Sequence, residues 1–183
     1  NVVSFRDAPR FCFEQWASND EASRETARGF VRAMVSGGNT DIFGSLKELL
    51  RLERTPGRPV VAVLVTDGRS TTGLTQSSDI IGEFSRLNSG EISVFALGIK
   101  QTSDTYLLDL LTYCNRGEAT MIRGGRWSIP DAMQNLLQTV NRPVLSDVDF
   151  RFAAGEGLEV YPVQTSNLYS DRPLVLYGRY PKD

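Results

Sequence analysis

Residues 60–72, VVAVLVTDGRSTT, hold the densest group of side chains in this sequence that could do chemistry. The apolar run 60–66 reads as a buried strand, and it ends in the carboxylate of Asp67. Hydroxyl groups follow at Ser70 and Thr71. Carboxylate and hydroxyl oxygens are the hard ligands that Mg²⁺, Ca²⁺ and Mn²⁺ prefer over the nitrogen and sulfur ligands of zinc.

A second polar segment, GGNTDI at 37–42, opens a predicted helix and supplies Thr40 and Asp41. Each segment taken alone is typical of a turn or a helix cap. In an open parallel sheet, however, ligands bind where the carboxyl ends of neighbouring strands meet. The two segments together therefore favour a divalent-cation site over two unrelated turns.

The elements that would position these groups alternate between strands and helices. Periodicity and cap signals predict strands at 1–6, 10–16, 60–66, 92–99 and 119–125, and helices at 18–38, 39–55, 77–90, 102–117 and 129–141. The two runs 60–66 and 92–99 are apolar without alternation, as expected of parallel strands buried on both faces. The pattern predicts an α/β fold with a doubly wound, mostly parallel sheet and an antiparallel edge hairpin.

The pattern changes after residue 142. Three β-like runs, at 148–152, 158–163 and 173–180, follow with no helix between them. We therefore predict two parts: a domain at 1–142 and a β-rich C-terminal extension at 143–183.

Composition limits the function classes. The 183 residues are 40% hydrophobic and 23% charged, with a net charge of −2, so the chain lacks the excess of basic residues expected of a nucleic-acid-binding protein. No apolar run is long enough for membrane insertion. The absence of histidine removes the usual triad base, and no phosphate-binding glycine loop is present, so we do not expect an enzyme. A hydrolase of Rossmann-like fold using Asp67 is an alternative, but it would need a second acid where Arg69 stands.

Cys12 and Cys114 are far apart in the sequence and match no metal-binding spacing. Free cysteine behaves as a small apolar residue and is often buried. We expect both thiols to be reduced and at least partly buried.

The order GGNTDIFGSL, VVAVLVTDGRST, ISVFALGI resembles a von Willebrand factor type A domain. The runs PVLSDVDFRF, EVYPV and NLYSDRPLVLYGRY resemble the segment that follows this domain in inter-alpha-trypsin inhibitor heavy chains and their bacterial relatives. The resemblance implies a six-stranded Rossmann-like sheet, a role in protein binding and adhesion, and an extracytoplasmic or cell-surface location.

The resemblance also implies a metal-ion-dependent adhesion site in which Thr40 and Asp67 are ligands, with Asp41, Ser70 and Thr71 around them. There the metal binds an acidic side chain of a protein partner. The family's first strand supplies further ligands from an Asp-x-Ser-x-Ser motif, which this sequence lacks. We therefore expect Mg²⁺, Ca²⁺ or Mn²⁺ in the intact parent and none in this chain. The alternative is a metal-independent scaffold that presents loops and the β extension.

The family's sheet order places the missing strand between residues 1–6 and 60–66. We predict that another strand fills this slot, because unpaired buried backbone groups are costly. The filler is a run from 144–180 of this chain, the same run from a neighbour in a strand-swapped homodimer, or the missing strand itself as a separate chain. The hypothesis makes Val2, Val3 and Phe5 buried.

Overall fold

The computed structural model describes residues 1–141, 143–145, 148, 159–161, 167–169 and 174–179. The chain forms two compact units. Unit 1 comprises residues 1–58 and 69–87, and unit 2 comprises residues 59–68 and 88–183. The predicted boundary at residue 142 stays a prediction, because much of the chain beyond it lies outside the described residues.

Unit 1 contains a β-hairpin, and its other elements are helices. Its elements are β1 (Val3–Phe5), β2 (Pro9–Phe11), α1 (Glu21–Arg32), α2 (Ile42–Leu49) and α3 (Ser77–Asn88), whose last residue belongs to unit 2. β1 and β2 pair antiparallel. The carboxylate of Asp20 caps α1 by accepting from the Ser23 amide at 2.8 Å, which satisfies one of the amides left unpaired at a helix start.

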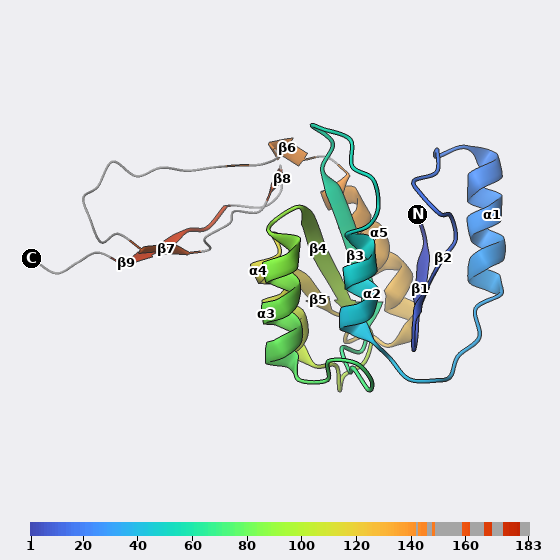
Figure 1. Ribbon diagram of the computed structural model, residues 1–183, viewed down its shortest axis with the longest axis horizontal. Helices are drawn as coiled ribbons and strands as arrows, with labels where there is room; N and C mark the ends of the chain where they lie inside the picture. Colours follow the sequence, from blue (N-terminus) through green and yellow to red (C-terminus); the bar gives the residue numbers. More distant parts are fainter. Residues whose placement is uncertain (142, 146–147, 149–158, 162–166, 170–173, 180–183) are drawn as a thin grey trace, which may run out of the picture. The chain divides into compact units, whose positions relative to one another are not determined.

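Unit 2 is built on a parallel sheet in the order β3-β4-β5 (Figure 1). Its elements are β3 (Val60–Thr66), β4 (Ile92–Gly98), α4 (Thr105–Cys114), β5 (Ala119–Met121), the 3₁₀ turn η1 (Arg126–Ser128) and α5 (Ile129–Val140). β3 and β4 are in register along all seven residues, from Val60 opposite Ile92 to Thr66 opposite Gly98. α4 packs on β4 and β5.

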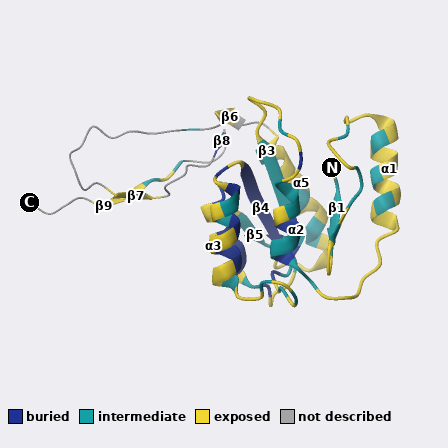
Figure 2. Cartoon of the chain, viewed as in Figure 1, coloured by how far each residue is buried: buried dark blue, intermediate teal, exposed yellow. Residues whose placement is uncertain are grey.

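One hydrophobic cluster of unit 2 lies on the face of the sheet that α5 covers. It comprises Phe95, Leu97, Ile122, Leu136 and Tyr169, and the valines of β3 pack against it. β4 is buried along its whole length, whereas β3 is mostly half-buried, as Figure 2 shows in dark blue and teal.

The described parts of the C-terminal segment form two small antiparallel pairs. β6 (Pro143–Leu145) pairs with β8 (Leu168–Tyr169), and β7 (Glu159–Tyr161) pairs with β9 (Tyr177–Arg179). The ring of Tyr169 meets that of Phe95 edge-on at 5.9 Å, so part of this segment packs directly on β4. The strand predicted at 148–152 lies almost entirely outside the described residues.

Two expectations need correction. Among the described residues, no strand pairs with both residues 1–6 and residues 60–66: β1 pairs with β2, β3 pairs with β4, and the C-terminal strands pair with one another. The prediction that this chain fills the slot itself is therefore wrong for the described residues, because their β runs pair with one another.

The second correction concerns the cysteines. Both are free thiols, and Cys12 is half-buried as expected, but Cys114 is exposed. Cys114 is the last residue of α4, and the buried face of that helix is formed by Leu107, Leu108 and Leu111. Position 114 follows Leu107 by seven residues and so lies near this face, which means that the exposure of Cys114 goes with its place at the end of the helix and not with the periodicity.

Candidate functional site

Asp67 directly follows β3, and its carboxylate forms an ion pair with a lysine that lies two residues after the end of β4. The Nζ atom of Lys100 lies 2.7 Å from Oδ2 of Asp67. The backbone carbonyl of Asp67 accepts from the Asp104 amide at 2.9 Å. Asp67 thus sits between the end of β4 and the start of α4, as expected at the carboxyl edge of a parallel sheet.

The local backbone explains this placement. β3 ends because the Gly68 amide donates to Oγ1 of Thr66 at 3.1 Å, which turns the chain away from the strand direction. Gly68 has φ +74°, a left-handed conformation that favours glycine, and a β-carbon there would lie 3.2 Å from the Asp104 carbonyl oxygen. Lys100 is fixed by a turn in which its amide donates to Oγ of Ser103 at 3.1 Å.

In unit 1, Thr40 and the loop at 70–72 form a clasp. The carbonyl of Thr40 accepts from the Thr71 amide at 2.8 Å, the Thr72 amide at 3.2 Å and the Ser70 hydroxyl at 3.1 Å. In return, the Thr40 amide donates to Oγ1 of Thr71 at 2.7 Å. The hydroxyls of Ser70 and Thr71 therefore tie two loops together through backbone groups.

Asp41 acts as the N-cap of α2. Its Oδ1 accepts from the Gly44 amide at 2.8 Å. Gly73 closes over the same carboxylate: a β-carbon at Gly73 would lie 2.7 Å from Oδ1 of Asp41, and its φ is +67°. The side chain of Asp41 is thus engaged by the start of the helix and by a glycine-dependent loop.

The structure brings Thr40, Asp41, Ser70 and Thr71 together in unit 1, and Asp67 belongs to unit 2. Sequence reasoning missed Lys100. The signal was available, because Lys100 follows the predicted strand 92–99 at the same sheet edge as Asp67.

Taken separately, the described residues of neither unit offer a ligand set that fits Mg²⁺, Ca²⁺ or Mn²⁺. Such ions require about six oxygen ligands, several of them carboxylates or ordered waters. In the part of the chain that the structure describes, no three Asp, Glu, His or Cys side chains are grouped to hold a metal. The carboxylate of Asp67 already forms an ion pair with the ammonium group of Lys100, which a metal ion would have to displace.

Comparisons with known proteins identify the family of the chain. The family described as von Willebrand factor type A domain matches residues 1–121. The inter-alpha-trypsin inhibitor heavy chain H1 of Sus scrofa is 25% identical over 166 residues, which cover 86% of this chain and 18% of that protein. The von Willebrand factor A domain-containing protein 5B1 of Mus musculus is 25% identical over 181 residues, covering 97% of this chain and 14% of that protein. The chain thus spans less than a fifth of the length of these curated relatives.

A solved structure shares the fold. The von Willebrand factor type A protein from Catenulispora acidiphila superposes with a TM-score of 0.77 at 19% identity, over 87% of this chain and 38% of that one. This likeness, with the parallel sheet of unit 2, confirms the predicted α/β fold class. No helix in the described residues has both the length and the apolar character needed to cross a membrane.

Proposed function

The chain belongs to the von Willebrand factor type A domain family, and from that premise we propose that it is a protein-binding module. The observation that carries the proposal is the family match over residues 1–121, which includes both segments singled out by their chemistry, GGNTDI and TDG. We assign no catalytic role, and an activity screen in which turnover disappears on Asp67→Ala would contradict that assignment.

In the finer form of the proposal, the intact parent binds an acidic side chain of a partner through Mg²⁺, Ca²⁺ or Mn²⁺. Thr40 and Asp67 are the two ligands that this chain contributes, and the clasp formed by Ser70 and Thr71 supports Thr40. An Asp-x-Ser-x-Ser strand would supply the remaining oxygens. Two ligands are too few to hold a hydrated divalent ion tightly, so the site in this chain is a remnant.

The second candidate is a metal-independent scaffold. The ion pair of 2.7 Å between Lys100 and Asp67 favours it, because a built-in cation already neutralises the carboxylate that a metal would use. In this case the loops at the carboxyl edge and the C-terminal strands contact the partner directly.

Calorimetric titration with Mn²⁺ separates the two candidates. We expect no saturable binding by residues 1–183, and saturable binding by a longer polypeptide that includes an Asp-x-Ser-x-Ser strand. Asp67→Ala should abolish that binding, and the control Asp79→Ala, an exposed aspartate in the first turn of α3, should not. Failure of the longer polypeptide to bind Mn²⁺ would select the scaffold.

Two further properties are proposals of the same kind. An extracytoplasmic or cell-surface location is inferred from the resemblance, and fractionation of the source cells tests it. A strand-swapped homodimer is tested by sedimentation, because its mass would be twice that of the monomer.

A further inference from the structure

The loop that joins β5 to α5 carries two arginines and a tryptophan. Its sequence at 123–127 is RGGRW, and it is called the RGGRW loop below. It follows the third strand of the parallel sheet, so it lies at the same carboxyl edge as Asp67 and Lys100. All five of its residues are exposed. Trp127 is 79% exposed, the highest fraction among the large apolar side chains that the structure describes.

Both ends of the RGGRW loop are held by the hydrophobic cluster of unit 2. Ile122 is 6% exposed and belongs to that cluster, and Ile129 packs against it. The Ile122 amide also donates to the Gly98 carbonyl at 2.9 Å, which ties the start of the loop to β4. Within the loop, the Ser128 amide donates to the Gly125 carbonyl at 3.1 Å and closes the 3₁₀ turn η1. The exposed side chains are therefore carried by a backbone that is fixed at both ends.

Arg126 and Trp127 stack on each other. The Cζ atom of Arg126 lies 4.7 Å from the centroid of the Trp127 ring, which is the geometry of a cation–π contact. Most of Trp127 stays open to solvent all the same. Tryptophan and arginine are residue types in which the binding energy of protein interfaces is concentrated. Stacking also holds the guanidinium in place, so Arg126 loses less conformational freedom when it binds a ligand.

The two guanidinium groups of the loop have no ion-pair partner in the part of the chain that the structure describes. Neither Arg123 nor Arg126 forms an ion pair there, although Asp131 stands in the first turn of the following helix. Lys100, at the same edge of the sheet, is by contrast paired with Asp67. A ligand that binds both arginines therefore breaks no ion pair among the described residues.

We propose that the RGGRW loop is a metal-independent binding site for a short acidic segment of a protein partner. Carboxylates of that segment bind Arg123 and Arg126, and an apolar or aromatic residue between them packs on Trp127. The planar guanidinium matches a carboxylate in bidentate geometry, and the open indole offers a large apolar surface.

The charge of the chain favours this class of partner. Two cations in a chain of net charge −2 suit one or two carboxylates, whereas a nucleic acid needs an extended basic surface. The inference rests on the proposed role in protein binding, but it involves neither Asp67 nor a metal ion.

The test uses the ¹⁵N-labelled full chain in EDTA and the peptide acetyl-Gly-Glu-Phe-Glu-Gly-amide. The chain has two tryptophans, and Trp127→Phe assigns their two indole N–H signals by removing one of them. The signal of Trp127 should shift saturably as peptide is added, and that of Trp16 should not. The matched peptide with glutamine in place of glutamate should bind at least about fivefold more weakly, because it keeps the shape and loses the charge.

Substitutions in the chain identify the groups that bind. Arg126→Ala should weaken binding of the glutamate peptide by at least about fivefold, and Arg123→Ala by at least about threefold. The matched control is Arg58→Ala, which removes an exposed arginine outside the loop and should leave the affinity within about twofold.

Several outcomes would overturn the proposal: no saturable binding, equal affinity for the two peptides, or equal losses in Arg126→Ala and Arg58→Ala. A peptide with phosphoserine in place of glutamate that binds more than about tenfold tighter would show that the loop is a phosphate site, and it too would overturn the proposal. Because EDTA is present, the result is independent of the titration with Mn²⁺, and failure of either experiment leaves the other proposal standing.

Discussion

β3 and β4 are two apolar strands of equal length that meet in full register, yet they differ in burial. All seven residues of β4 are buried, whereas in β3 Leu64 and Thr66 are buried and the other five are half-buried. β4 has β3 on one side and β5 on the other, and β3 has β4 alone among the described strands. An apolar run therefore sets the tendency to be buried, but the number of neighbouring strands decides how far burial goes.

The largest effect should come from truncating opposite partners across the two strands. Phe95 is 2% exposed and lies opposite Val63. We expect Phe95→Ala to lower the free energy of unfolding by about 3–5 kcal/mol, and Val63→Ala by about 1 kcal/mol, because half-buried carbon loses less on truncation. Urea denaturation measures both, and equal losses would contradict the comparison.

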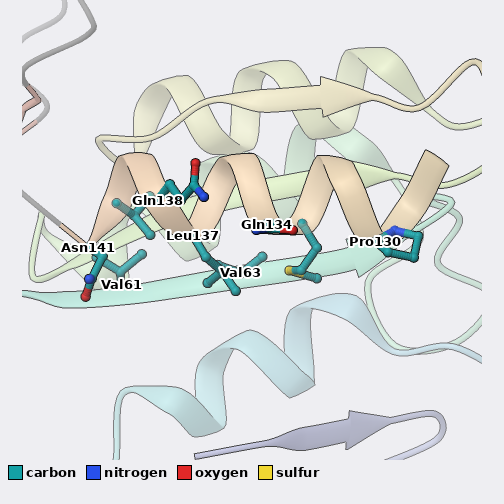
Figure 3. A pocket seen from close by; sticks show the side chains of 9 residues that line it. Val61, Val63, Pro130, Gln134, Leu137, Gln138 and Asn141 are labelled. Carbon is teal, nitrogen blue, oxygen red and sulfur yellow. The ribbon is translucent and has the colours of Figure 1, made fainter.

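Two consecutive leucines on α5 test the same contrast from the helix side. Leu136 is 4% exposed in the core cluster, and Leu137 is 48% exposed where it lines a groove of about 780 Å³ between α5 and β3 (Figure 3). Leu136→Ala should cost about 3 kcal/mol and Leu137→Ala less than about 1 kcal/mol. Thermal denaturation of both variants checks this, and equal losses for the two leucines would contradict the contrast.

Two buried asparagine side chains, those of Asn88 and Asn115, hold the start of β4. The side chain of Asn88 donates at 2.8 Å to the carbonyl of Ile92 and to Oδ1 of Asn115, and neither asparagine is exposed. Asn115→Ala should lower the free energy of unfolding by about 2 kcal/mol, because it removes a partner of a buried donor. The exposed Asn141 is the control, and its replacement by Ala should cost less than about 0.5 kcal/mol in the same urea titration.

The smallest effect concerns the ion pair that joins the ends of the two strands. The side chain of Lys100 is 61% exposed and that of Asp67 is 26% exposed. Lys100→Ala should therefore change the free energy of unfolding by less than about 1 kcal/mol, and by less still in 1 M NaCl, where the interaction is screened. A larger loss that persists at high salt would mean that Lys100 contributes through packing.

Much of the fold could be predicted from local signals. Cap residues marked two helix starts, since Asp20 and Asp104 each accept a hydrogen bond from an amide in the first turn. The strands 60–66 and 92–99 were predicted almost to the residue. Their different burial could not be predicted, because both runs are apolar and the count of neighbouring strands is a property of the whole sheet.

The candidate site was less predictable. Asp67 was identified because a carboxylate at a strand end is conspicuous in the sequence, but its partner Lys100 lies 33 residues away. The hydroxyls of Ser70 and Thr71 suggested metal ligands, whereas the structure uses them in hydrogen bonds with the backbone of Thr40. Residue type indicates what a side chain can bind, and only the fold shows which neighbouring group it contacts.

The sequence of β3 also bears on how the protein behaves at high concentration. The stretch 60–65, VVAVLV, is uncharged, rich in β-branched residues and free of proline and glycine, which is the composition of segments that stack into cross-β fibrils. Charges flank it only at Arg58 and Asp67, so nothing within the stretch repels a second copy. In the folded protein these residues pair with β4, and unfolding would release them as a template for aggregation.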